Sequence, residues 1–243
     1  MASSSAVLLR GVSTETSSPL SRAFSAATAT EGRLTLSIFA VVLSLGLALG
    51  FATDNASFLS SVGGAWPRVS NVLGWTYFSA WSISFWPQIL QNAKRGTVSG
   101  LSFDFIFLNF VGFSCYTAYN TGLYWSPTIR AEYAADHGGS LPSVQSQDVF
   151  FGIHAVALTG ITIAQIGAYD RGGQTVSLLA RAILGVLVTL MAGAAAVVAS
   201  GAGGFRWLDY LTFLSWVKVA ITLMKYIPQA LLNYRRKSTK GWT

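Results

Sequence analysis

Two ionisable side chains inside apolar segments are the residues of this sequence best suited to chemistry. Asp104 lies in GLSFDFIFLNF, and Lys225 lies within the apolar segment 207–233. A charged group at membrane depth is costly and by default marks a functional site. An apolar environment favours the protonated form of a carboxyl group, so Asp104 could take up and release a proton. Lys225 needs an anionic partner, which could be Asp104 or the carboxylate of a substrate.

Two further residues could move protons. Asp148 opens the apolar segment 148–168, and His154 follows about one and a half turns later. Imidazole changes charge between about pH 5 and 8, which suits a proton relay. We therefore predict Asp104, Asp148 and His154 as proton-coupling residues. Helix capping remains an alternative for the two aspartates, and packing remains one for His154.

A Pro-Gln pair occurs twice, as Pro87-Gln88 and as Pro228-Gln229. Proline removes one helical hydrogen bond and kinks the chain. In a membrane the freed carbonyl must face protein or a water-filled cavity. We therefore predict Pro87 and Pro228 as hinges of a pathway. Neighbouring polar and aromatic side chains are predicted to bind the substrate, and they are Lys225, Tyr226, Asn92, Asn109, Asn233, Gln88, Gln229 and Trp81.

Enzymatic chemistry finds little support in the sequence. His137 and His154 are not spaced as metal ligands, and Cys115 is the only cysteine, without an evident histidine partner. No glycine-rich motif typical of phosphate binding occurs. We predict that the chain is not an enzyme and that it holds neither a metal nor a cofactor.

The composition is that of a membrane protein. Of the 243 residues, 52% are hydrophobic and only 10% are charged, whereas soluble domains carry about 25% charged residues. A membrane-spanning helix needs roughly 20 apolar residues. The segments that meet this requirement are 34–52, 71–92, 101–121, 148–168, 178–200 and 207–233. The sequence therefore predicts an all-α polytopic membrane protein embedded in a lipid bilayer.

Basic residues give the orientation of these helices. They gather in the loops that follow segments 71–92, 148–168 and 207–233, which the positive-inside rule places in the cytosol. The net charge of +7 is thus explained by membrane orientation, and we expect no nucleic-acid partner. The sequence Asn55-Ala56-Ser57 then lies on the lumenal side, where Asn55 could be glycosylated.

The two Pro-Gln segments belong to an internal repeat with an offset of 141 residues. At this offset Pro87, Gln88, Leu90, Asn92, Arg95 and Gly100 meet Pro228, Gln229, Leu231, Asn233, Arg236 and Gly241. Both copies run toward the cytosol because an extra linker helix, 178–200, lies between the two units. The repeat is therefore parallel, as in many transporters. The counterpart of helix 101–121 would begin near position 242, so the second unit is predicted to be incomplete.

These features divide the chain into six parts. They are a Ser/Thr-rich leader (1–33), an extra hydrophobic helix or signal anchor (34–52), a lumenal segment (53–70), a first three-helix unit with the first Pro-Gln motif (71–168), a loop and linker helix (169–206), and the first helix of the second unit with the second motif (207–243). Because alternating access needs two units, we expect the 243-residue chain not to transport by itself.

WSISFWPQILQNAKRGTVSGLSFDF and VKVAITLMKYIPQALLNYRRKSTKGWT resemble the PQ-loop family of membrane transporters. The match is closest to its lysosomal members that carry cystine with protons, and it covers roughly residues 71–243. The resemblance implies PQ-loop three-helix repeats and proton-coupled export of cystine from a lysosome or vacuole to the cytosol by alternating access. It also implies that Asp104 matches the aspartate of the family's proton pathway.

The partners implied by the resemblance are cystine, protons and the lipid bilayer, with an oligomer left open. Other interpretations remain at this point. The chain could be a PQ-loop carrier of sugars or other amino acids, a non-transporting membrane receptor, or an inactive fragment.

Overall fold

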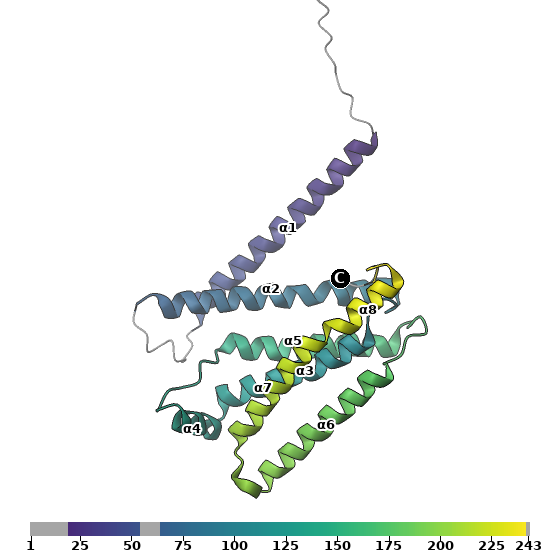
Figure 1. The fold of residues 1–243 in the computed structure, drawn as a ribbon. Coiled ribbons are helices and arrows are strands. Elements are labelled where there is room, and N and C mark those ends of the chain that lie inside the picture. The colour runs from purple at the N-terminus through teal and green to yellow at the C-terminus, as the bar shows by residue number, and fades with distance from the viewer. Residues whose placement is uncertain (1–18, 54–63, 242–243) are drawn as a thin grey trace, which may run out of the picture. The chain divides into compact units, whose positions relative to one another are not determined.

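The computed structural model describes residues 19–53 and 64–241, and these ranges contain helices and loops but no strand (Figure 1). The elements are α1 (Pro19–Ala52), α2 (Trp66–Arg95), α3 (Phe103–Trp125), α4 (Pro127–Asp136), α5 (Ser146–Ala168), α6 (Leu178–Ala199), a short 3₁₀ helix η2 (Ala202–Gly204), α7 (Trp207–Met224) and α8 (Tyr226–Arg236). The predicted all-α class is confirmed.

Four stretches of the described chain are long and apolar enough to cross a membrane. They are Arg33–Ala52, Ser146–Ala168, Leu178–Ala199 and Trp207–Arg236. Helices α2 and α3 are also long enough, at 30 and 23 residues, but they are more polar. Their polar residues are largely turned inward, as Asn71, Asn92 and Asn109 are all buried. That α2 and α3 also span the bilayer remains a prediction.

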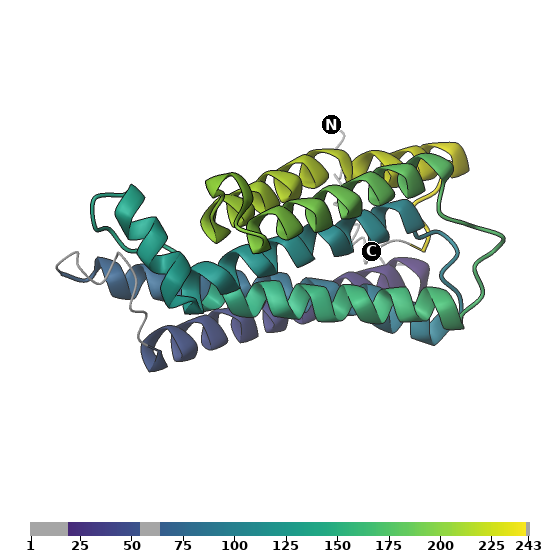
Figure 2. The same ribbon diagram turned by 90° about the horizontal axis from the view of Figure 1, so that it is seen from below.

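Helix α3 forms the centre of the bundle. It contacts α5 on one side and α7 on the other, while α2 packs on α5 and α6 packs on α7 (Figure 2). Between α3 and α7, the buried side chains are Leu108, Cys115, Leu211, Leu214, Val217 and Ile221. In lipid such a contact depends on close packing, because apolar side chains gain little from leaving an apolar solvent.

Helix α1 corrects the predicted leader, because it begins at Pro19 and not at residue 34. Proline suits the first turn of a helix, and the following residues are rich in alanine. The last turns of α1, within residues 42–52, are held to α2. Asn71 donates hydrogen bonds from its Nδ2 to the carbonyls of Gly50 and Thr53, at 2.8 and 2.7 Å. The predicted glycosylation site at Asn55 lies outside the described residues.

Two loop regions contain more helix than the sequence predicted. Helix α2 begins at Trp66, inside the predicted lumenal segment 53–70, because Pro67 stands in its first turn. Helix α4 was not predicted at all. Its start is set by Ser126, whose side chain accepts a hydrogen bond from the backbone N–H of Ile129, and by Pro127.

The predicted membrane-spanning segment 207–233 is present as Trp207–Arg236, and it bends at Lys225, where α7 ends and α8 begins. Pro228 has no N–H to offer the carbonyl of Met224, and its ring crowds that carbonyl. The first motif behaves differently, since Pro87 lies inside the unbroken helix α2. The two prolines therefore do not form a matched pair of kinks in this structure, and their role as hinges stays a prediction.

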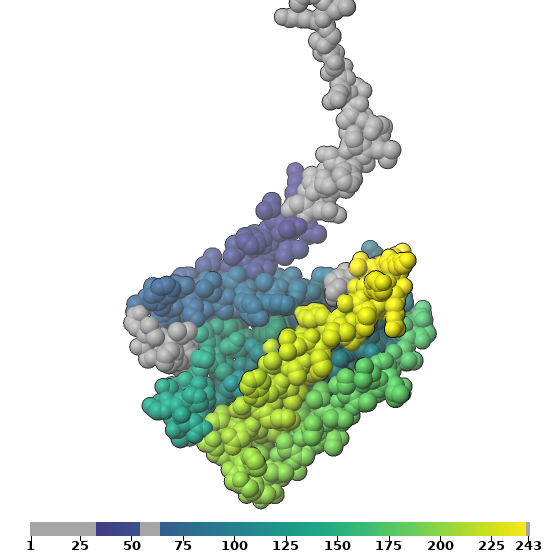
Figure 3. All heavy atoms as spheres, viewed as in Figure 1, coloured from purple at the N-terminus to yellow at the C-terminus, as the bar shows by residue number. Residues whose placement is uncertain are grey.

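The internal repeat is confirmed where the two PQ motifs end. Gly100 and Gly241 both have a φ of 103°, and the preceding residues Gly96 and Lys237 both adopt left-handed backbone conformations. The two turns touch, because a Cβ on Gly100 would lie 3.2 Å from the Cα of Gly241. The residues that follow α8, shown in yellow in Figures 1 and 3, make this contact, because helices α2 and α8 do not contact each other. We call this contact the PQ crossing.

Hydrogen bonds at the PQ crossing follow the repeat. Gln88 donates from its Nε2 to the carbonyl of Gly241 at 3.1 Å, and Gln229 donates from its Nε2 to the carbonyl of Gly100 at 3.4 Å. Each glutamine thus contacts the turn of the other repeat. Helices α2 and α8 both end just before the touching turns, so the two motifs point the same way and the parallel repeats are confirmed.

We expect Gly100→Ala to lower the free energy of unfolding by about 1–3 kcal/mol, as forcing a side chain into a disfavoured backbone conformation does. The added Cβ would also lie 2.7 Å from the carbonyl oxygen of Lys240. The control is Gly185→Ala in α6, where nothing lies within 4 Å and alanine favours the helix by about 0.5–1 kcal/mol. Thermal unfolding in detergent measures both, and equal effects would contradict the role of the crossing.

At the opposite end of the bundle, α4 is fastened to the start of α7. Glu132 accepts a hydrogen bond from the backbone N–H of Leu208 at 2.9 Å, and Arg206 pairs with Asp136 at 2.7 Å. The hydrogen bonds from Arg206 hold the pKa of Asp136 below its ordinary value. Because the pKa of Asp136 is lowered, the Arg206–Asp136 ion pair is lost only when the pH falls through that lowered pKa. We therefore expect the ion pair to persist at about pH 5, the pH at which histidine-based pH sensors switch.

Candidate functional site

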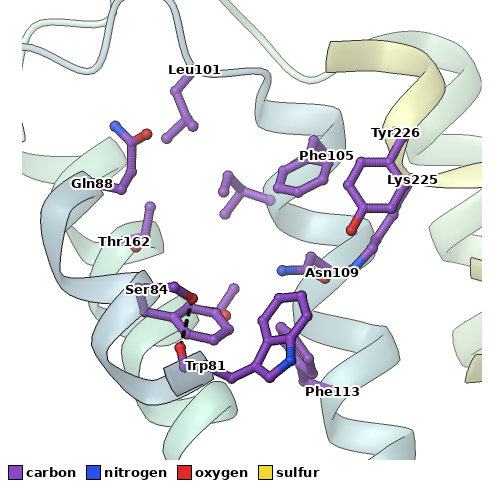
Figure 4. Close-up of a pocket in the computed structure, with 13 residues that line it drawn as sticks. Trp81, Ser84, Gln88, Leu101, Phe105, Asn109, Phe113, Thr162, Lys225 and Tyr226 are labelled. Atoms are coloured by element: carbon purple, nitrogen blue, oxygen red, sulfur yellow. Dashed lines mark hydrogen bonds between the residues drawn. The ribbon is translucent and has the colours of Figure 1, made fainter. Parts of the chain in front are cut away.

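A cavity of about 200 Å³ lies between α2, α3, α5 and the break between α7 and α8 (Figure 4). It is lined by Trp81, Ser84, Phe85, Gln88, Leu101, Phe105, Ile106, Asn109, Phe113, Thr159, Thr162, Lys225 and Tyr226. Five of the predicted substrate-binding residues are therefore brought together, and they are Trp81, Gln88, Asn109, Lys225 and Tyr226. No carboxylate is among the lining residues.

Lys225 is the charged centre of this cavity. Its ammonium group donates a hydrogen bond to the side-chain oxygen of Asn109 at 2.9 Å. The rings of Tyr226, Phe113 and Phe105 surround it, with centroids 5.0, 5.4 and 5.8 Å from the Nζ atom. Cation–π contacts of this kind stabilise a cation without neutralising it. None of these contacts is made by a carboxylate, so the ammonium group has no anionic partner among the residues that line the cavity.

The local sequence explains how these residues converge. Phe105, Asn109 and Phe113 are four residues apart on α3, a spacing that places them on one face of the helix. The break caused by Pro228 lets Lys225 and Tyr226 turn toward that face, as Figure 4 shows. Our sequence analysis missed Phe105 and Phe113, although their spacing from Asn109 was a usable signal. It also missed Thr159 and Thr162, which are buried polar residues of helix α5.

Three predicted substrate-binding residues lie elsewhere. Asn92, Gln229 and Asn233 do not line the cavity, and the first two are only 2% and 1% exposed. Asn92 accepts a hydrogen bond from Gln88 at 2.8 Å, and Asn233 accepts the equivalent bond from Gln229 at 3.0 Å. This correction has a simple cause: amides four residues apart on a helix bond to one another. These residues support the PQ crossing.

Asp104 is not the partner of Lys225, contrary to one sequence-based interpretation. It stands in the first turn of α3, where one of its carboxylate oxygens accepts a hydrogen bond from the backbone N–H of Ser177 at 2.8 Å. It also lines a second cavity, of about 460 Å³, together with Gln174, Pro228 and Arg235. Asp104 and Asn109 are only five residues apart on α3, but they line different cavities.

The other two predicted proton-coupling residues are also apart from the Lys225 cavity. Asp148 caps α5, because its carboxylate accepts a hydrogen bond from the backbone N–H of Gln145 at 2.9 Å. The alternative of helix capping therefore applies to it. The Nε2 atom of His154 is buried and has no hydrogen-bond partner among the described atoms, and its ring packs edge-on against Phe78. Proton coupling by either residue stays a prediction.

Comparisons with known proteins agree with the PQ-loop repeats of this fold. The PQ loop repeat family matches residues 69–129 and 210–243. Cystinosin of Bos taurus is 45% identical over 177 residues, covering 72% of this chain and 47% of its own length. Cystinosin of Drosophila melanogaster is 46% identical over 177 residues, covering 72% of this chain and 43% of its own length. A protein of Saccharomyces cerevisiae named cystine transporter is 26% identical, covering 70% and 69% of the two chains.

The parallel repeats, the paired motifs and the helical bundle define an all-α membrane protein of the PQ-loop type. Over about residues 71–243 the chain is similar to the cystinosins. It spans about half the length of the cystinosins that it matches.

Proposed function

We propose that this chain binds cystine in the Lys225 cavity and takes part in its proton-coupled export from a lysosome or vacuole to the cytosol. The observation that carries the proposal is the convergence of Lys225, Asn109 and aromatic rings on one cavity in a cystinosin-like chain. The relative from Saccharomyces cerevisiae is named a cystine transporter, which supports the same substrate.

Cystine carries two carboxylates and two ammonium groups, and the cavity offers a partner for each kind of charge. Lys225 binds one carboxylate, and Asn109 donates to it from its amide nitrogen once the ammonium group turns to the ligand. The exposed face of Trp81 and the ring of Tyr226 receive an ammonium group by cation–π contact. Phe105 and Phe113 pack against the apolar disulfide, because aromatic rings contact sulfur favourably.

Proton coupling is assigned to Asp104, with Asp148 and His154 as further candidates. Asp104 is half-buried and lies on the same helix as Asn109, one and a half turns away. Protonation at about pH 5 in the lumen and release in the neutral cytosol would couple its charge to the position of α3. Alternating access would then proceed by movement of the two repeats about the PQ crossing.

The test is binding of radiolabelled cystine by the purified chain in lipid nanodiscs, at pH 5 and at pH 7. We expect saturable binding that unlabelled cystine displaces and that glucose does not. Displacement by glucose would favour a sugar carrier, and an absence of saturable cystine binding would contradict the proposal.

A further inference from the structure

Six basic residues meet at the PQ crossing, although they come from two segments far apart in the sequence. They are Lys94, Arg95, Arg235, Arg236, Lys237 and Lys240, and all of them are exposed. We call this group the basic cluster. The first two end α2 and the others end α8 or follow it, so the cluster exists only because the two repeats cross.

Arg95 and Arg236 are equivalent in the repeat and reach across it in opposite directions. A Cβ on Gly100 would lie 2.6 Å from the Nη1 of Arg236, and a Cβ on Gly241 would lie 3.5 Å from the Nη1 of Arg95. Each guanidinium group therefore rests on the turn of the other repeat. Because both glycines lack a side chain, the two groups flank one small area of backbone.

No carboxylate neutralises the basic cluster within residues 64–241. The ion pairs of this part of the chain are both formed by Arg206, at the opposite end of the bundle. Asp104 lines the same cavity as Arg235 but forms no ion pair with it among the described residues, and it accepts a backbone hydrogen bond from Ser177. Asp170 accepts one from Gly172. Like charges held together this way repel one another, so an anionic partner stabilises them.

The position of the cluster identifies the source of that anion. The apolar stretch Trp207–Arg236 ends within the cluster, so its bases lie where the hydrocarbon gives way to lipid headgroups. Clusters of about 4–8 basic residues next to a membrane helix bind anionic lipids. Two arginine forks also suit phosphate, which accepts paired hydrogen bonds from each guanidinium group.

We propose that the basic cluster binds the headgroup of a multiply phosphorylated inositol lipid, with Arg95 and Arg236 holding it from opposite repeats. Such a lipid bridges the two PQ motifs, and its binding stabilises the PQ crossing. A lipid with a single negative charge satisfies one guanidinium group and leaves the other unpaired.

The test is titration of the purified chain, in phosphatidylcholine nanodiscs at 0.15 M salt, with dioctanoyl phosphatidylinositol bisphosphate. Dioctanoyl phosphatidylserine and free inositol trisphosphate are titrated in parallel. At about fivefold in affinity per basic residue, Arg95→Gln with Arg236→Gln weakens binding of the bisphosphate lipid by about 30-fold. Arg95→Lys with Arg236→Lys keeps the charge but not the fork, and loses less.

The control is Arg68→Gln with Arg130→Gln, which removes one charge from the start of α2 and one from α4 and leaves binding within about twofold, since both charges lie at the opposite end of the bundle from the cluster. Equal losses in the two glutamine pairs would overturn the proposal, as would equal affinity for phosphatidylserine. Binding of inositol trisphosphate as tight as that of the lipid would overturn the lipid as the source. Circular dichroism confirms that each variant remains helical. The assay does not involve cystine, so its result is independent of the proposed transport.

Discussion

Lys225→Met is expected to weaken cystine binding by roughly 10–150-fold, because a hydrogen bond to a charged group contributes about 1.5–3 kcal/mol. Methionine has a similar length and an uncharged end, so it loses both the hydrogen bond to Asn109 and the cation–π contacts of the ammonium group. It removes only the ammonium group that faces Asn109. Equilibrium binding of radiolabelled cystine in nanodiscs measures the loss.

The control for this experiment is Lys94→Met, which removes an equal charge from an exposed position at the end of α2. We expect its cystine affinity to equal that of the unmodified chain. If Lys225→Met bound cystine as tightly as the control, the Lys225 cavity would not be the cystine site. A fall in both variants would instead show that only the net charge matters.

Asp104→Asn is expected to abolish the uptake of a proton on cystine binding. Asparagine has almost the same shape and its oxygen can still accept the hydrogen bond from Ser177, but it does not titrate. Calorimetry in buffers with different ionisation enthalpies counts the protons. We expect about one proton for the unmodified chain near pH 5 and none for the variant, since proton binding follows the linkage between charge and ligand.

Asp170→Asn provides a matched comparison for Asp104→Asn. Asp170 lies near the same end of the bundle and also accepts a hydrogen bond from a backbone N–H, that of Gly172, at 3.0 Å. It should leave the proton count unchanged. An unchanged count for Asp104→Asn as well would restrict Asp104 to a structural role at the start of α6.

Helix positions were predictable where the pattern was local. The apolar segments 148–168 and 178–200 differ from α5 and α6 by two residues or fewer at either end, because length and hydropathy alone decide such helices. Helix α4 was missed because its start depends on Ser126 and Pro127 and not on an apolar period. The bend in segment 207–233 was predictable from Pro228, and the structure places it at Lys225.

The sequence by itself determined the class of protein and the parallel repeat, and it predicted Lys225 as a substrate-binding residue. Each of these follows from composition, from a fixed offset between matching residues or from a charge in an apolar segment. Only the tertiary structure decided the partners. It separated Asp104 from Lys225, joined Lys225 to Asn109, and assigned Asn92 and Gln229 to the PQ crossing. The physical reason is that sequence spacing fixes which face of a helix a residue occupies, whereas the packing of other helices decides what that face meets.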